Sequence, residues 1–125
     1  MFNWFKKSGA ESEGKSAGPI PEIDSDTDLD ALIAQDTVIL FKHSTACPTS
    51  WAAHLQVMKF VDAHPEFPVR MVSVIQERAT SNKIAEKTGI RHQSPQIIFL
   101  RQGKVVSAIS HGSITVAQLN QLIAD

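Results

Sequence analysis

The chain has 125 residues, of which 42% are hydrophobic and 20% charged, and its formal net charge is −1, values that suit one globular domain. The near-neutral charge gives no electrostatic reason to expect nucleic acid or a membrane surface as a partner, and no apolar run approaches the roughly 20 residues of a membrane span. The only cysteine, Cys47, excludes an intramolecular disulfide framework and a cysteine-based zinc site, so we expect a cytoplasmic protein without a bound metal or cofactor.

Residues 1–19 are predicted to be a flexible tail ahead of a folded domain over residues 20–125. The opening "MFNWFKK" places its charges after a very short aromatic segment, which is the wrong order and length for a secretory signal. Residues 8–19 are rich in Ser, Gly, Ala, Glu and Lys and have no apolar periodicity. The aromatic start could contact a partner or a membrane surface, although chain ends are more often disordered.

A helix and a buried strand open the domain. In "DSDTDLDALIAQ" Thr27 is the expected N-cap, and the leucines and isoleucine that follow lie on one helical face. The run "TVILFK" (37–42) is continuously apolar and β-branched, which is typical of a strand covered on both faces. A short edge strand near residues 20–24 is a further option.

A second helix is expected directly after Cys47. Pro48 fits the first helical position, where a missing N–H costs nothing. The helix should end before Pro65, because the residue before a proline disfavours helical dihedral angles. A second strand follows at "VRMVSVI" (69–75). The core-facing side of the helix is predicted at Trp51, Leu55 and Met58, widened by Val57, Phe60 and Val61.

A third helix and a hairpin come next. The helix is expected to start at Thr80 or Ser81 and to end at Gly89, which can adopt the left-handed C-cap conformation. The stretch "PQIIFLRQGKVVSAIS" (95–110) predicts two strands joined at a short loop containing Gly103, which is a β-hairpin signal.

The last segment predicts a helix with Thr115 and Gln118 as a capping box. The order helix, strand, helix, strand, helix, strand, strand, helix requires parallel strands with helical crossovers and a closing antiparallel hairpin. We therefore predict an α/β fold of thioredoxin-like architecture, in which a mixed four- to five-stranded sheet carries helices on both faces.

In this architecture Cys47 lies where a central strand ends and a helix begins. The free N–H groups of the first turn and the helix dipole favour the thiolate, which is the reactive form in disulfide exchange. Lys42 and His43 could add positive potential, although strand alternation points them in opposite directions. Ser50 stands where dithiol proteins have a second cysteine. It can donate a hydrogen bond to the thiolate, but a mixed disulfide on Cys47 then needs an external thiol to resolve it.

A proline directly before a strand is the second candidate site feature. In a thioredoxin-like layout the loop of Ser94 and Pro95 lies against the cysteine, and the bond between them is expected to be cis. The backbone of Ser94 would then be free to pair with an extended thiol substrate. On local sequence alone, the alternative is an ordinary trans proline at the start of a strand.

The five histidines are His43, His54, His64, His92 and His111, and no pair has convincing metal-ligand spacing on a predicted helix. His92 is the best histidine candidate for a role in substrate binding. His111 is a weaker candidate, and His54 and His64 are expected to face solvent. We regard Trp51 as core or rim packing rather than as a binding platform.

Three stretches, "FKHSTACPTS", "SNKIAEKTGIRHQSPQ" and "SHGSIT", together resemble the monothiol bacilliredoxins, thioredoxin-like proteins of the bacillithiol system, over about residues 22–125. The resemblance implies that Cys47 attacks the bacillithiol sulfur in protein mixed disulfides and carries it away. It implies thiolated client proteins as partners and a low-molecular-weight thiol, bacillithiol or a relative, as co-substrate. Thr45 and Pro48 belong to the matching pattern and are expected to support the thiolate.

The chain departs from the family pattern at three positions near the expected site. The usual Thr-Cys-Pro-Ile-Ser is replaced by a motif with Ala46 and Thr49, which changes the rim that meets the substrate. Gly112 follows His111 where the family often has an aromatic residue.

Two other functions compete with this interpretation. A one-cysteine peroxidase would carry a threonine three residues before the cysteine in a Pro-x-x-x-Thr-x-x-Cys motif, whereas Thr45 lies two residues before Cys47. A thioredoxin-like binding module without redox turnover could use the aromatic N-terminus to dock on a partner.

Overall fold

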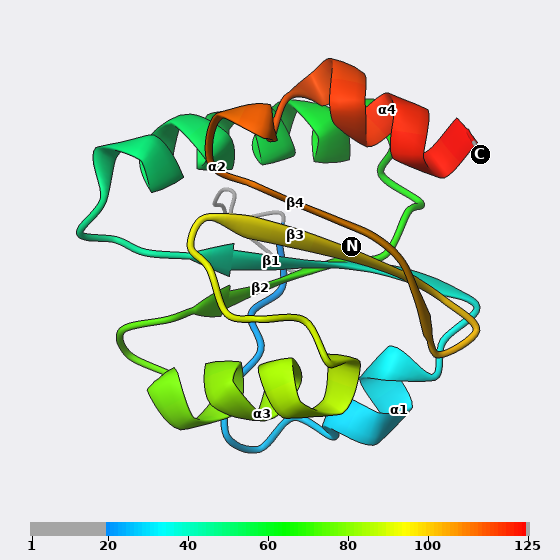
Figure 1. Ribbon diagram of the computed structural model, residues 1–125. Helices are drawn as coiled ribbons and strands as arrows, with labels where there is room; N and C mark the ends of the chain where they lie inside the picture. The colour runs from blue at the N-terminus through cyan, green and yellow to red at the C-terminus, as the bar shows by residue number, and fades with distance from the viewer. Residues whose placement is uncertain (1–19, 125) are drawn as a thin grey trace, which may run out of the picture.

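The computed structural model describes residues 20–124 as one sheet between two layers of helices (Figure 1). The flexible tail expected over residues 1–19 lies outside the described residues. In chain order the elements are α1 (Leu29–Ile33), β1 (Thr37–His43), α2 (Pro48–Ala63), β2 (Val69–Ser73), α3 (Arg78–Thr88), β3 (Gln96–Arg101), β4 (Lys104–Ser110), the 3₁₀ turn η1 (His111–Ser113) and α4 (Val116–Ala124).

The sheet has four strands in the order β2-β1-β3-β4. β1 runs parallel to β2 and antiparallel to β3, and β4 closes the sheet as the second strand of a hairpin. The expected edge strand near residues 20–24 is reduced to a single parallel bridge between Glu22 and Met71. The predicted α/β architecture with a mixed sheet and helices on both faces is thus confirmed, and four strands is the observed number.

β1 lies at the centre and contributes to two hydrophobic cores. Phe41 points to the layer of α2 and α4, where it joins Phe60 and Leu119. Leu40 points to the layer of α1 and α3, where it joins Ile84. Because consecutive strand residues face opposite sides of a sheet, a strand buried on both faces reads as a continuous apolar run.

Two predicted helix starts are wrong. The N-cap of α1 is Asp28, whose carboxylate accepts the backbone N–H of Ala31 at 3.1 Å, and not Thr27. α3 begins at Arg78, before Thr80 and Ser81, which are buried residues within the helix. Ahead of α1 several neighbouring residues can cap a helix, whereas the N-cap of α3 is Glu77, whose side chain makes no cap hydrogen bond, so no capping residue marks its start.

Three local predictions are confirmed. Gly89 ends α3 with a left-handed φ of 73°. The β3–β4 turn has positive φ at both Gln102 (52°) and Gly103 (80°), as the tight turns of hairpins require. Thr115 is the expected capping residue, and its hydroxyl accepts the backbone N–H of Gln118 at 3.2 Å, which is one half of the expected capping box.

The predicted inner face of α2 is confirmed at Val57, Phe60 and Val61 and is wrong at Trp51 and Leu55. Trp51 and Leu55 are 47% and 62% exposed. Met58 is partly buried against the same core, and the buried residues that were not predicted are Ser50 and Ala53. Apolar side chains occur on more than one side of this helix, so its periodicity did not decide which side meets the sheet. The consequence for the site is that the polar Ser50 points inward.

Candidate functional site

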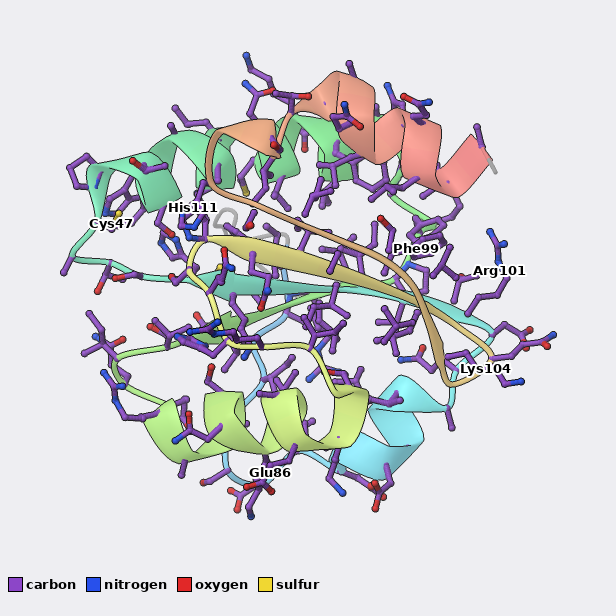
Figure 2. The ribbon with its side chains drawn as sticks, in the orientation of Figure 1. Cys47, Glu86, Phe99, Arg101, Lys104 and His111 are labelled. Atoms are coloured by element: carbon purple, nitrogen blue, oxygen red, sulfur yellow. The ribbon has the colours of Figure 1, made fainter. Side chains whose placement is uncertain are left out.

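Cys47 forms the junction between β1 and α2. It is the N-cap residue of α2, with extended dihedral angles (φ −116°, ψ 119°), and Pro48 follows as the first helical residue. Its carbonyl accepts the backbone N–H groups of Ser50 (3.0 Å) and Trp51 (3.2 Å) and so starts the helix. Figure 2 shows the partly exposed Cys47 at the N-terminal end of α2. This is the end of the helix at which the helix dipole favours an anion.

Ser50, expected to support the thiolate, is completely buried beneath this end of the helix. Its hydroxyl lies 2.7 Å from Nδ1 of His43 and accepts the backbone N–H of Ser44 at 2.9 Å. Within residues 20–124, no side chain is hydrogen-bonded to the sulfur of Cys47. Ser50 is therefore tied to the strand and the loop that lead into Cys47.

His43 faces α2 and is only 2% exposed. Its ring packs against Trp51 edge to face, with centroids 4.6 Å apart, and against His54 at 4.9 Å. Burial, reinforced by the neighbouring His54, lowers the pKa of His43 to about 4, against the opposing effect of the Ser50 backbone. His43 is therefore neutral near pH 7, and it supports the site through hydrogen bonding rather than through positive charge.

Lys42 enters the opposite layer, as strand alternation predicts. It is completely buried, and its ammonium donates to the carbonyl of Ser81 (3.0 Å) and to Nδ1 of His92 (3.2 Å). Burial lowers the pKa of Lys42 to about 8. Burial and the charges of Lys42 and Arg78 also lower the pKa of His92. The structure thus brings Lys42 and His92 together on the α3 side of the sheet, away from the side chain of His43.

The loop before β3 contains the expected cis bond between Ser94 and Pro95. The carbonyl of Pro95 accepts the backbone N–H of His111 at 3.0 Å, and the His111 side chain is hydrogen-bonded to Gln93 at 2.9 Å. The hydroxyl of Ser94 is buried, and it has no hydrogen-bond partner within residues 20–124. The cis-proline loop is therefore held by its neighbouring hairpin and carries one unsatisfied polar group.

This loop lies at the same end of the sheet as Cys47. Gln96, the first residue of β3, pairs with Lys42 near the end of β1, and η1, which begins at His111, packs against α2. Figure 2 shows Cys47 and His111 at this end of the molecule, far from Arg101 and Lys104 at the hairpin turn. Cys47 and the Ser94–Pro95 segment thus share one edge of the molecule.

Thr45, also expected to support the thiolate, contributes through its backbone. Its carbonyl accepts the indole N–H of Trp51 at 2.9 Å. Trp51 is exposed at the rim, and Leu55 is exposed on the next turn of α2. The segment before Cys47 is thus fixed to α2, and an apolar strip extends along the helix from the cysteine.

The partial burial of His54 was not predicted from the sequence. His54 was expected to face solvent, but it is half-buried against Phe41 and His43, and burial lowers its pKa. Its spacing of four residues from Ser50 would have placed both on one helical face. That signal was available only once Ser50 was known to point inward.

The described residues offer neither a metal centre nor a membrane-spanning helix. Within residues 20–124, no three His, Cys, Asp or Glu side chains gather in a way that could hold a metal ion. Over the same range, every helix is too short or too polar to cross a bilayer.

Comparisons with known proteins agree with this geometry. The family model described as "Monothiol bacilliredoxin BrxC" matches residues 21–119. A structure described as a candidate oxidoreductase with a thioredoxin fold is 33% identical, with a TM-score of 0.77, over 85% of this chain and 95% of that one. Thioredoxin from Trypanosoma brucei brucei has a TM-score of 0.69 at 16% identity, over 91% and 96% of the two chains. Mitochondrial thioredoxin 3 from Saccharomyces cerevisiae has a TM-score of 0.67 at 20% identity, over 85% and 94%.

Proposed function

The chain belongs to the monothiol bacilliredoxin family and has the thioredoxin fold, and from this premise we propose that it removes a low-molecular-weight thiol from protein mixed disulfides through Cys47. The family and the fold support a thiol–disulfide redox function. The observation that carries the finer proposal is a lone cysteine at the N-cap of α2, with Ser50 in place of a second thiol. A protein built this way can accept a thiol but cannot release it unaided.

The proposed reaction is one disulfide exchange followed by a second. The Cys47 thiolate attacks the sulfur of the small thiol in the client's mixed disulfide. A bond forms between Cys47 and that sulfur, the original S–S bond breaks, and the client cysteine leaves as a thiolate that takes up a proton. A thiol from outside then attacks the disulfide on Cys47, forms a disulfide with the small thiol and restores the Cys47 thiolate. Each exchange conserves the number of disulfides.

The surroundings of Cys47 suit such a substrate. The positive end of the α2 dipole favours the attacking thiolate, and the Ser94–Pro95 segment at the same edge offers a place for the backbone beside a client's modified cysteine. The exposed side chains of Trp51 and Leu55 offer apolar contact to a client protein. We propose bacillithiol or a relative as the small thiol and the cytoplasm as the compartment, because clearing Cys47 requires a pool of reduced thiols.

The test uses a client protein that carries bacillithiol on a single cysteine. Intact-mass measurement should show the client losing one bacillithiol while this protein gains one, with the adduct on Cys47. The Cys47→Ser variant is the control and should take up none. A client that keeps its modification in the presence of the wild-type protein would exclude the proposal. Exposure to hydrogen peroxide alone separates the peroxidase alternative, which requires rapid conversion of Cys47 to a sulfenic acid.

A further inference from the structure

The buried pair of His43 and Ser50 has one hydrogen-bond donor too many. Neutral His43 carries one N–H and Ser50 carries one O–H. The two side chains share a single hydrogen bond of 2.7 Å, and the other partner of the pair is the Ser44 N–H, which is itself a donor. Nε2 of His43 is buried without a partner within residues 20–124. One of the two hydrogens therefore remains unpaired, whichever side chain donates.

The two possible tautomers leave different hydrogens unpaired. If Ser50 donates to Nδ1, the hydrogen of His43 is on Nε2, fixed in the ring plane at a buried position without an acceptor. If Nδ1–H donates to Ser50, the serine oxygen accepts from both His43 and Ser44, and its own hydrogen is unpaired. A hydroxyl hydrogen can rotate to find an acceptor, whereas an unpaired buried N–H is rare and costly. The second tautomer is therefore the more stable.

The unpaired hydroxyl belongs to a residue placed to reach back to Cys47. Ser50 is the third residue of α2 and Cys47 is its N-cap, and residues three apart at a helix are neighbours on its surface. With both lone pairs of its oxygen occupied, Ser50 can act toward Cys47 only as a donor. A donor stabilises a thiolate more than a thiol.

We propose that His43 is a positioning residue that donates its Nδ1–H to Ser50 and thereby commits the Ser50 hydroxyl to donate to the Cys47 thiolate. This proposal deepens the proposed function, since it concerns the same attacking thiolate. The other titratable side chain packed against His43 is His54 on α2. Lys42, on the same strand, faces the other layer and is bonded there.

The tautomer can be observed directly in the unmodified wild-type protein. Long-range ¹H–¹⁵N correlation spectra near pH 7 distinguish protonated from unprotonated ring nitrogens, and the His43→Asn variant identifies the His43 signals. We expect the hydrogen of His43 on Nδ1. A hydrogen on Nε2 would overturn the proposal. Neither result depends on bacillithiol or on any client protein.

A second experiment measures what His43 does for Cys47. The readout is the rate of Cys47 alkylation by iodoacetamide near pH 7 divided by the rate near pH 10, a ratio that cancels differences in access. Asparagine can present an N–H close to the position of Nδ1, whereas leucine cannot. Loss of one hydrogen bond to the thiolate in His43→Leu should lower the ratio about tenfold, and His43→Asn should restore most of it.

The Ser50→Ala background provides the control. Without the hydroxyl, replacing His43 by leucine should change the ratio less than about twofold, because His43 acts only through Ser50. A tenfold effect of His43→Leu that persists without Ser50, or an equal loss in His43→Asn and His43→Leu, would show that His43 acts by another route. De-thiolation of clients is not measured here, so a failure of this proposal is distinguishable from a failure of the proposed function.

Discussion

Lys42 and His43 are consecutive buried residues of β1, yet their side chains enter opposite layers and join two different polar clusters. The α3-side cluster contains Lys42, Ser81 and His92. The α2-side cluster contains His43, Ser44 and Ser50. Each combines a buried serine with a histidine, and in each the pKa of the strand residue is lowered by burial, to about 8 for Lys42 and about 4 for His43.

The clusters differ in whether every hydrogen-bond donor has an acceptor. In the α3-side cluster, the ammonium of Lys42 donates to two acceptors that come from α3 and from the loop after it, so it ties three segments together. In the α2-side cluster, two neutral groups and a backbone N–H leave one donor without an acceptor, next to the N-cap of α2. We therefore propose that similar residues serve structure on the α3 side of β1 and chemistry on the α2 side.

The largest expected effect is a difference in the rate of thiol transfer between a variant on the α2 side of β1 and a variant on the α3 side. Replacing Cys47 by serine should abolish transfer of the small thiol, because an alcohol is neither a comparable nucleophile nor a disulfide partner. Replacing Ser81 by alanine should leave the transfer rate within about twofold, because its hydroxyl makes only a 3.4 Å contact with His92 on the opposite face. Both variants can be compared by intact-mass kinetics with one client. Strong loss of transfer in Ser81→Ala would break the distinction between the faces.

The α3-side cluster should make the free energy of unfolding depend on pH in alkaline solution. An unfolded lysine has a pKa near 10.5, against about 8 for Lys42 in the folded protein. Between these values the unfolded chain holds more protons, so the free energy of unfolding contributed by Lys42 rises with pH. From about pH 8 to about pH 10 the wild-type protein should gain on the order of 2–3 kcal/mol relative to Lys42→Met. Urea unfolding of both proteins over this range measures the difference, and parallel profiles would contradict the assignment.

The α2-side cluster should make the free energy of unfolding depend on pH in acidic solution. The folded pKa of His43 is about 4 and its ordinary value is 6.5. Between these values the unfolded chain again holds more protons, so stability falls as the pH drops from about 6.5 to about 4. His54 and His92 shift in the same direction, so the diagnostic quantity is the difference between wild type and His43→Asn. The wild-type protein should lose up to about 3 kcal/mol more, and equal losses would exclude a buried neutral His43.

The elements of this fold were predictable where the signal is local. The tight turn at Gly103, the left-handed Gly89 and the capping residue Thr115 each follow from what one or two residues can do by themselves. The buried strand β1 followed from a continuous apolar run. These features carry enough information to define the order of elements, and hence the position of Cys47 between a strand and a helix.

The chemistry around Cys47 was less predictable, because it depends on contacts between distant segments. Strand alternation showed that Lys42 and His43 point in opposite directions, but not which layer each enters. The burial of Lys42 requires a carbonyl that lies 39 residues further along the chain. The inward turn of Ser50, which makes His43 its partner, was hidden by apolar residues on two sides of α2. Sequence located the thiol, and tertiary packing determined the hydrogen bonds of the side chains around it.

The smallest expected effect is the most direct test of the comparison, since each cluster contains one buried serine. Removing the Ser50 hydroxyl leaves the Ser44 N–H and Nδ1 of His43 without their partner, which should cost about 1–3 kcal/mol of stability. Removing the Ser81 hydroxyl breaks only its 3.4 Å contact and leaves the bond from Lys42 to the Ser81 carbonyl intact, so the cost should stay below about 1 kcal/mol.

Urea unfolding near pH 7 of the two alanine variants gives both values under matched conditions, and Cys47 alkylation gives a second, independent contrast. Ser50→Ala should slow alkylation near pH 7, because the thiolate loses a donor, whereas Ser81→Ala should not. If the two variants behaved alike in both measurements, the donor left over in the α2-side cluster would have no bearing on Cys47. The functional difference between the two faces of β1 would then rest on the position of the cysteine alone.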